Sequence, residues 1–359
     1  MASFLKTARR SEPGTAAEIV VPPPPTERWA PALLAAAAEL TGSEPTFAED
    51  PAALPHGFGP WAFGLRLGDD PIGLTVRLAT DRAELEREVA AMERSRAHGC
   101  AAPTVRGIVA LDPEQGAADG SSVSWALLTD VVDAVGLPEL IGFNLHHSTE
   151  LLDGFAAHHD AIHRLPIDDL LDHSAIPVID APTEVARIDA DRYPAERAWL
   201  DEHVAPSGTP VLCHGGYQPL AVFGPPAEAW PDHGGPGHGL TVVNWAGAVL
   251  AEPELDMAFT LVAFWSAPFF APNRSERTAI KMIRNTLLST YKQGYTARRQ
   301  IDPDRLRFWQ AFHALRGMAR IDGAYDADGS PFAAADRGAV PTDLGPELHR
   351  HFRQLTRVR

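Results

Sequence analysis

The stretch that decides the fold is residues 211–221, which read Val-Leu-Cys-His-Gly-Gly-Tyr-Gln-Pro-Leu-Ala. Its apolar start predicts a short buried strand from Pro210 to Cys213, and the glycines that follow predict a tight turn. A turn after a strand is the simplest interpretation of this stretch, and by itself that interpretation says nothing about function.

Two further phrases downstream argue against a chance turn. A second strand-like piece, Leu240 to Trp245, ends in Thr-Val-Val-Asn-Trp, after a segment at 224–239 that is rich in proline, glycine and histidine. Residues 252–258 then read Glu-Pro-Glu-Leu-Asp-Met-Ala and lead into a predicted helix over 254–266. The three phrases together specify a fold much better than any one of them.

In this order the phrases resemble the catalytic region of the aminoglycoside phosphotransferase family, whose members are kinase-like enzymes. Residues 214–221 are similar to the family's catalytic loop, which reads His-Gly-Asp, four residues, then Asn. Asn244-Trp245 is similar to the Asp-Trp that ends the family's metal-binding strand, and residues 252–258 are similar to its Asp-Pro-x-x-Asp-Leu-Ala. The resemblance implies a cleft built for phosphoryl transfer from ATP.

The resemblance extends upstream, so that it covers roughly residues 50–320. His163-Arg164-Leu165-Pro166 is similar to the family's helix-ending Leu-His-x-Leu-Pro, and Val76-Arg77-Leu78 with Glu88 is similar to its small-lobe ion pair. It implies an α+β, bilobal, protein-kinase-like fold with a five-stranded antiparallel sheet and a long helix in the small lobe.

The predicted elements agree with that organisation. Residues 1–25 are expected to be a flexible N-terminal tail, 26–133 a kinase-like N-lobe, and 134–359 a helical C-lobe with a catalytic-loop-like segment at 211–256. Hydrophobic periodicity, turn residues and caps predict the elements themselves. The N-lobe strands are expected at 61–67, 72–78, 100–111 and 123–132, and the main helices at 26–42, 81–97, 254–266, 274–294, 303–320 and 345–357.

The departures from the family pattern concern the catalytic side chains. The family's base falls on Gly216, its metal-binding Asn on Ala221, and its metal-binding Asp on Asn244, while His214 is kept. Magnesium prefers carboxylate and phosphate oxygens, so these residues predict weak or absent magnesium binding and no intact catalytic residue. We therefore expect a catalytically impaired family member, a pseudokinase.

Arg77 and Glu88 form a predicted ion pair independently of the resemblance. Glu88 shares the apolar face of the helix at 81–97 with Leu85 and Met92, and a buried carboxylate needs a partner. Arg77, on a neighbouring predicted strand, is the natural candidate. In the family this cation contacts nucleotide phosphates, and a purely structural salt bridge is the alternative.

The resemblance assigns further residues to the cleft. Thr129 and Val131, in the segment that joins the lobes, are expected to receive the adenine of ATP or another nucleotide, with Arg77, Glu88 and Asn244 near its phosphates. Tyr217, Asp256 and Trp265 are the candidates for substrate binding. No residue is assigned to a metal.

Histidines on the predicted helix over 151–162 suggest another kind of site. His159 and His163 share a helical face at i, i+4, as a pair of metal ligands would. No acidic partner is fixed by the sequence, and the resemblance explains His163 as a packed, hydrogen-bonded residue. A packed pair is therefore the preferred interpretation.

Composition limits the classes of function. With 359 residues, 45% of them hydrophobic, the chain suits a large globular protein of two lobes, and a formal charge of −16 disfavours general binding of nucleic acid or anionic membranes. Two cysteines do not make a disulfide framework, and neither a signal peptide nor a membrane span is recognisable. A reducing cytoplasm is the expected location.

Three hypotheses for function remain open. The first is an impaired phosphotransferase homologue that binds a small molecule, a nucleotide or a protein partner. The second is an active ATP-dependent phosphotransferase in which Asp256, Glu252 or the more distant Asp201 replaces a lost carboxylate. The third is a cleft of the same fold that performs other chemistry, since a fold does not fix a function. The sequence leaves the ligand and the oligomeric state open.

Overall fold

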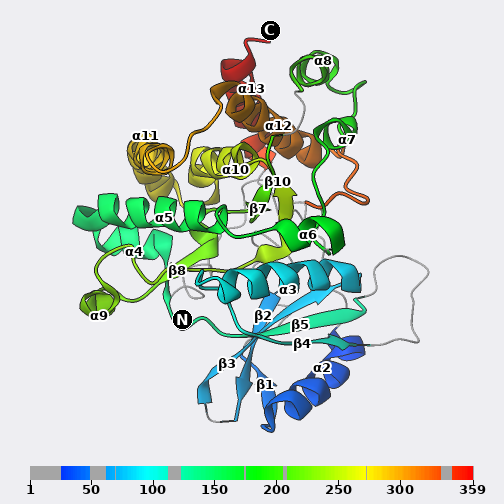
Figure 1. Cartoon of the computed structure of the whole chain (residues 1–359), viewed down its shortest axis with the longest axis vertical. Helices are drawn as coiled ribbons and strands as arrows, with labels where there is room; N and C mark the ends of the chain where they lie inside the picture. The colour runs from blue at the N-terminus through cyan, green and yellow to red at the C-terminus, as the bar shows by residue number, and fades with distance from the viewer. Residues whose placement is uncertain are drawn as a thin grey trace.

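The N-terminal lobe is an antiparallel sheet between two helices (Figure 1). The computed structural model describes residues 26–48, 62–68, 70–111, 123–173, 175–204, 208–271, 273–332 and 342–358. Within these ranges the sheet has five strands in the order β1-β2-β3-β5-β4, which confirms the predicted sheet. The elements of this lobe are α2 (Thr26–Thr41), β1 (Pro45–Phe47), β2 (Ala62–Leu67), β3 (Asp70–Ala79), α3 (Arg82–Ala97), β4 (Val105–Ala110) and β5 (Trp125–Asp130).

The two faces of the sheet follow from alternation along β3. Leu74 and Val76 pack in one cluster with Trp29 and Leu33 of α2. Arg77, one position further along the strand, points to the opposite face and bonds Glu88 of α3. Successive residues of a strand face opposite sides of the sheet. Strand β3 therefore contributes apolar side chains to the core under α2 and a charged side chain to the layer under α3. Helix α3 lies between the sheet and the second lobe (Figure 1).

The C-terminal lobe is mostly helical and is built around two small sheets. Its strands form one pair, β7 with β10, and one group of three in the order β6-β8-β9. The strands are β6 (Val135–Gly136), β7 (Val211–Cys213), β8 (Val222–Gly224), β9 (Thr241–Val242) and β10 (Val249–Ala251). The α-helices are α4 (Leu137–Phe143), α5 (Ser148–Ile162), α6 (Asp168–His173), α7 (Ala181–Ala186), α8 (Pro194–His203), α9 (Trp230–His233), α10 (Pro253–Ser266), α11 (Arg274–Thr296), α12 (Pro303–Ile321) and α13 (Gly345–Thr356).

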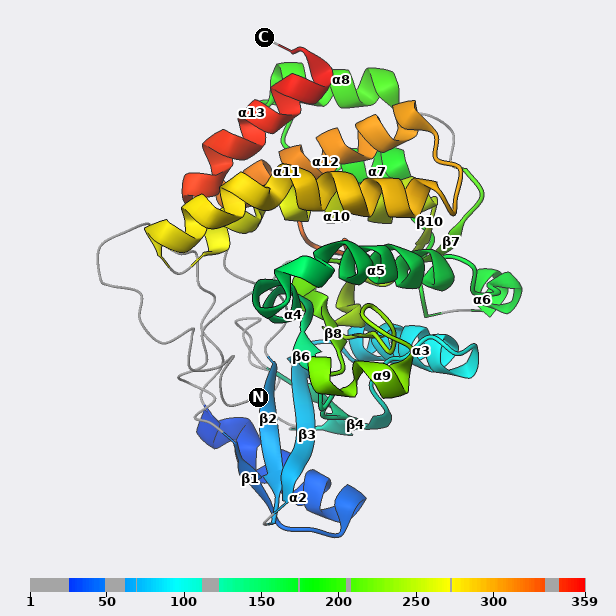
Figure 2. The ribbon, with the colours of Figure 1, turned by 90° about the vertical axis from the view of Figure 1, so that its left-hand side faces the viewer.

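The long helices of this lobe pack in layers. Helix α11 lies along α5, α12 packs on α10, and α13 covers α12 (Figure 2). Two short 3-10 helices complete the region around β7, namely η3 (Pro219–Ala221) and η5 (Trp245–Gly247). Helix α3 of the first lobe packs against η5, so the two lobes meet close to the segment that follows β7.

Most predicted elements are confirmed, with shifts of a few residues at their ends. The predicted strand at 100–111 is shorter, at Val105–Ala110, and the strands β1 and β10 were not predicted. The predicted tail at 1–25 lies outside the described residues. None of the described helices combines the length and apolar character needed to cross a bilayer.

Candidate functional site

The turn after β7 is fixed by the close approach of two backbone segments. Gly215 has a φ of +72°, and a Cβ atom there would lie 1.8 Å from the carbonyl oxygen of Gly247 in η5. A side chain at this position would therefore need both a left-handed backbone and a displaced neighbour. Glycine is required here because the backbone of the turn packs directly against that of η5.

Asp256 holds this turn in place from the first turn of α10. Its side chain is fully buried, and it accepts the backbone N–H of His214 at 2.7 Å and that of Gly215 at 3.0 Å. His159 and His163 add Nε2 contacts to Asp256 Oδ2 at 3.0 and 3.3 Å. Burying a charged carboxylate is costly, and hydrogen bonds from several donors compensate that cost.

Two tyrosines of α11 continue this network. The Nδ1 atom of His159 lies 2.7 Å from the hydroxyl of Tyr291, and Nδ1 of His163 contacts the hydroxyl of Tyr295. The pairs match because both helices repeat the i, i+4 spacing. If each hydroxyl donates to Nδ1, each Nε2–H donates to Asp256, and every polar atom of the network has a partner.

The pKa values agree with a neutral His159 beside an ionised Asp256. Burial, reinforced by the proximity of the His163 ring, lowers the pKa of His159 to about 3. Burial alone would raise the pKa of Asp256, but the hydrogen bonds from His159 and His163 outweigh it and hold that pKa well below its usual value. The network therefore holds one buried negative charge, on Asp256, among several hydrogen-bond donors.

These three residues also have the spacing of a metal site. Among the described residues, His159, His163 and Asp256 form the one group of three or more ligating side chains whose ligand atoms lie close enough to hold an ion. The hydrogen bonds already satisfy all three side chains, and a metal would have to displace the protons on both Nε2 atoms. The geometry favours a hydrogen-bonded brace for the turn.

Gly216, Ala221 and Asn244, the positions that the resemblance assigns to catalytic side chains, lie around this braced turn. Gly216 has no positive φ, and a Cβ atom there would meet only His214, at 3.7 and 3.8 Å. Ala221 is buried at the end of η3. Asn244 is left-handed, with φ 64° and ψ 59°, and its Oδ1 atom is buried without a hydrogen-bond partner in the described structure.

His214 presents a second unpaired acceptor beside Gly216. Its Nε2 lies 3.0 Å from the carbonyl oxygen of Val243, so Nε2 carries the proton and Nδ1 has a free lone pair. Nδ1 is buried and has no partner within the described part of the chain. Burial lowers the pKa of His214, so the ring stays neutral. This corner offers neutral acceptors where the resemblance implies carboxylates.

The candidate replacement carboxylates are engaged elsewhere. Asp256 is bound by the turn and the two histidines, as described above. Glu252 faces away from the turn and accepts from Gly208 N at 2.8 Å and from Arg305 and Trp309. Asp201 pairs with Arg197 of the same helix, α8, at the surface. In this structure none of the three supplies a free oxygen at the positions of Gly216 and Asn244.

The predicted ion pair of the small lobe is confirmed. Arg77 is 5% exposed, its Nη1 donates to Glu88, and its Nη2 lies 3.5 Å from Glu84. Thr129 of β5 pairs in register with Thr75, two positions before Arg77 on the same face of β3. The N–H of Val131 already donates to the carbonyl oxygen of Gly73 at 3.3 Å, so it is not free to bind an adenine.

The residues predicted to bind substrate are buried in this structure, and their assignment to substrate stays a prediction. Tyr217 is 0% exposed, stacks on His159 and donates its hydroxyl to the Phe155 carbonyl at 2.8 Å. Asp256 is also 0% exposed. Trp265 stacks on His351, with the Arg284 guanidinium over its ring. Sequence reasoning saw polar and aromatic residues near the loop but had no signal that the helices close over them.

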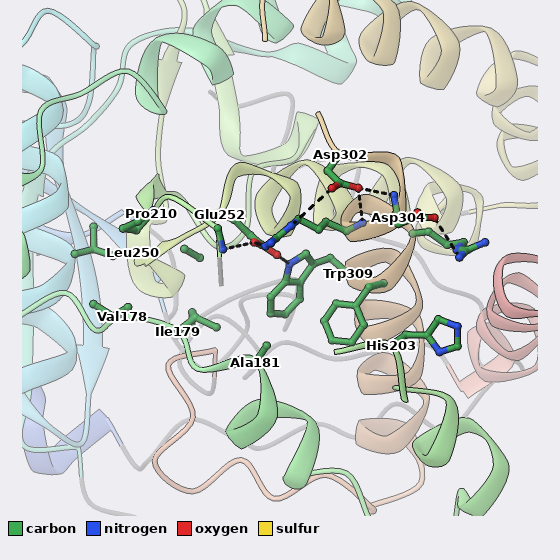
Figure 3. Close-up of a pocket in the computed structure, with 15 residues that line it drawn as sticks. Val178, Ile179, Ala181, His203, Pro210, Leu250, Glu252, Asp302, Asp304 and Trp309 are labelled. Atoms are coloured by element: carbon green, nitrogen blue, oxygen red, sulfur yellow. Dashed lines mark hydrogen bonds and ion pairs between the residues drawn. The ribbon is translucent and has the colours of Figure 1, made fainter. Parts of the chain in front are cut away.

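A cavity of about 410 Å³ lies elsewhere in the C-lobe (Figure 3). Glu252 and Trp309 point toward each other in its lining, and Asp302 and Asp304 lie at the start of α12 (Figure 3). None of the residues that line it is Arg77, Gly216, Ala221 or Asn244. The cavity is therefore separate from the braced turn. Its lining is Val178, Ile179, Ala181, His203, Gly208, Pro210, Leu250, Ala251, Glu252, Asp302, Asp304, Arg305, Arg307, Phe308 and Trp309.

Comparisons with solved structures identify the fold. No family model matches the sequence, and no curated protein matches it. An amicoumacin kinase structure aligns with a TM-score of 0.55 at 10% identity, over 87% of this chain and 88% of that chain. A thermostable variant of the aminoglycoside phosphotransferase APH(4)-Ia gives a TM-score of 0.54 at 14% identity, over 91% and 98%.

A third similar structure is that of aminoglycoside 2'-phosphotransferase-IIIa. It aligns with a TM-score of 0.53 at 12% identity, over 92% of this chain and 98% of that chain. Alignments that cover nearly the whole of both chains include both lobes. The chain therefore has the bilobal, kinase-like fold of the aminoglycoside phosphotransferases and related small-molecule kinases.

Proposed function

We propose that this protein is a catalytically impaired member of the aminoglycoside phosphotransferase fold, a pseudokinase that acts by binding a ligand in its cleft. The observation that carries the proposal concerns the segment after β7, whose backbone is firmly held although the family's catalytic positions have no carboxylate. Its backbone is held by Asp256 in a single defined position, while Gly216, Ala221 and Asn244 present no carboxylate. The scaffold for phosphoryl transfer is kept and its reactive groups are missing.

The missing groups are the ones that the reaction depends on most. Phosphoryl transfer is catalysed by positioning, by neutralising the phosphate charge with a metal, and by a base that orients the attacking hydroxyl. A general base contributes about 10²–10⁴ in rate, and a metal stabilises the transition state by several kcal/mol more. One neutral amide at Asn244 does not fit magnesium, which prefers charged oxygen ligands.

The alternative of an active enzyme with replacement carboxylates has little support. Asp256, Glu252 and Asp201 are bound to other partners, and moving Asp256 would release the turn that it holds. A repurposed cleft with other chemistry has no specific observation in its favour. Binding without phosphoryl transfer therefore explains the geometry with the fewest assumptions.

Arg77 supports the binding part of the proposal. A guanidinium that is kept buried beside Glu88, although Ala221 and Asn244 of the other lobe offer no charged metal ligand, suits a nucleotide or another anionic small molecule. A protein partner on the acidic surface is a further candidate ligand. We propose a reducing cytoplasm as the setting, which agrees with the free thiols of Cys100 and Cys213.

The proposal is tested by restoring the lost groups. The triple replacement Gly216→Asp, Ala221→Asn, Asn244→Asp is expected to create magnesium-dependent ATP hydrolysis, because a side chain at 216 has room and the backbone at 244 already suits an aspartate. The single replacement Asn244→Asp, which restores a metal ligand but no base, is the matched control. Ordinary phosphorylation of a hydroxyl substrate by the unmodified protein would overturn the proposal.

A further inference from the structure

The cavity in the C-lobe has the size and the lining of a small-molecule site (Figure 3). Its volume of about 410 Å³ lies in the range of ~300–1,000 Å³ that is typical of ligand pockets. Val178, Ile179 and Leu250 give it apolar walls, and Phe308 and Trp309 of α12 add two aromatic rings. Most of its charged lining residues lie in the first turns of α12. Such a lining suits a ligand with an apolar body and one polar group.

One buried carboxylate, that of Glu252, holds the polar part of the lining together. It accepts hydrogen bonds from Gly208 N at 2.8 Å, from Arg305 Nη1 and from Trp309 Nε1. A Cβ atom at Gly208 would lie 2.8 Å from Glu252 Oε2 and 3.2 Å from Arg305 Nη1, so the chain packs directly on this ion pair. Both oxygens of Glu252 are used. This carboxylate is therefore a fixed part of the wall and not a partner for a ligand.

The start of α12 does not offer the cavity an anion site. A helix N-terminus binds anions through its free backbone N–H groups. Here the first residue of the helix is Pro303, which has no N–H group. The side chain of Asp302 caps the helix and accepts the next two, Asp304 N at 2.9 Å and Arg305 N at 3.2 Å. The backbone donors that an anion would need are therefore already taken.

The charges around the cavity leave one carboxylate without a cation of its own. Arg307 pairs with Asp304 at 3.2 Å. Arg305 bonds Glu252, and its Nε atom lies 3.8 Å from Oδ2 of Asp302, so one guanidinium faces two carboxylates. The acidic and arginine side chains of the lining are three carboxylates and two guanidiniums, which leaves one negative charge in excess. Charge complementarity therefore favours a cation.

We propose that this cavity binds a small organic monocation, a protonated primary amine on an apolar body. The ammonium group donates to Oδ2 of Asp302, the oxygen that the helix cap does not use. The apolar body packs on Val178, Leu250 and the ring of Phe308, and the aromatic rings of the lining also attract a cation. The site goes beyond the proposed function, because none of its residues belongs to the braced turn or to the small lobe.

The experiment is an NMR titration of the full chain with three probes that share a phenyl body and differ in charge. 2-Phenylethylamine is expected to bind most tightly, 2-phenylethanol more weakly, and 3-phenylpropionate most weakly. Asp302→Asn removes the excess charge and keeps the cap, because asparagine caps helices as well as aspartate does. It is expected to weaken binding of the amine about fivefold and to leave that of the alcohol unchanged. The matched control is Asp304→Asn, whose side chain is 83% exposed and pairs with Arg307, and it should leave both affinities unchanged.

A second variant tests the cavity itself. Val178 is 55% exposed, so the fold should tolerate Val178→Trp, whose larger side chain fills part of the cavity. This variant is expected to abolish binding of the amine and of the alcohol. Leu171→Trp, at an exposed position of α6 outside the lining, is the control and should bind both as the unmodified chain does. Thermal melting of each variant verifies its fold.

The results separate the site from the class of its ligand. Absence of amine binding at millimolar concentration, or binding that Val178→Trp leaves unchanged, would overturn the site. Equal affinity for the amine and the carboxylate, or an Asp302→Asn variant that binds the amine as tightly as the unmodified chain, would overturn the cation. Each of these results would leave the pseudokinase proposal standing, because that proposal depends on Gly216, Ala221 and Asn244.

Discussion

The carboxylate of Asp256 accepts the backbone N–H of His214 at 2.7 Å, across 42 positions of the sequence, and this contact fixes the turn that carries Gly216. The same oxygen contacts His159 and His163. One buried charge thus joins α5, α10 and the turn after β7, and α11 joins through its tyrosines. The predictions below follow from this arrangement.

Asp256→Asn is expected to lower the free energy of unfolding by about 3–5 kcal/mol, the usual cost of breaking a buried charged network. The amide NH2 would replace one of the two acceptor oxygens, so it would face the N–H group of either His214 or Gly215. Asp201→Asn is the control, because that side chain is 52% exposed and its pair with Arg197 contributes about 1 kcal/mol at most. Urea denaturation of both variants measures the difference, and equal losses would contradict the account.

Tyr291→Phe is expected to cost about 1–3 kcal/mol, because it leaves Nδ1 of the buried His159 without its donor. The loss should be coupled to that of Asp256→Asn by more than about 0.5 kcal/mol in a double-mutant cycle, since both belong to one network. The same cycle with Asp201→Asn should be additive. Additivity in both cycles would show that the hydroxyl does not support Asp256.

The adjacent glycines are expected to respond in opposite ways to alanine. Gly215→Ala should destabilise by about 3 kcal/mol, because a left-handed backbone and an overlap with the Gly247 carbonyl act together. Gly216→Ala has room for its methyl group, so stability should be unchanged or up to about 1 kcal/mol higher. Thermal melting distinguishes the two variants, and similar effects at both positions would contradict the described turn.

Much of the fold was predictable because the signals were local. The helix at 81–97 was predictable from its N-cap and its periodicity. In the structure the side chain of Asp81 accepts a hydrogen bond from the backbone N–H of Ala83 at the start of this helix. Strand β10 gave no such signal, because three apolar residues become a strand only by pairing with β7. The same is true of β1, whose three residues pair with β2.

The sequence positions of the site residues could be predicted, but the burial of the side chains around them could not. Motif spacing located Gly216, Ala221 and Asn244, and helix periodicity located the partner of Arg77. The burial of Tyr217 and Asp256 depends on α5 and α11, which close over them from distant parts of the chain. Tyr291 and Tyr295 did carry a usable signal, since their i, i+4 spacing repeats that of His159 and His163.

Stability is expected to fall as the pH drops below about 6.5. Burial lowers the pKa of His158 and of His351 to about 4 and that of His159 to about 3. Below pH 6.5 these histidines are therefore protonated in the unfolded chain while they stay neutral in the folded chain. Their contribution to stability is complete above pH 6.5 and is lost toward the folded pKa values. At pH 5 each of these histidines lowers the free energy of unfolding by about 2 kcal/mol relative to neutral pH.

The measurement is the free energy of unfolding by urea at pH values from 7 to 5. His351→Phe should keep the stacking on Trp265 and remove one titrating group. The slope of stability against pH should then decrease by about 1 kcal/mol per pH unit on average over this range. A stability that stays constant over this range would contradict neutral burial of the histidines.

The central claim is that the cleft has lost its divalent-ion chemistry and kept its binding role. Calorimetric titration of the unmodified chain with ATP, once with magnesium and once with a chelator, tests this most directly. The account predicts the same affinity in both titrations and no ADP formed on incubation. Tight binding that requires magnesium, with phosphate transferred to a hydroxyl acceptor at ordinary kinase rates, would contradict it.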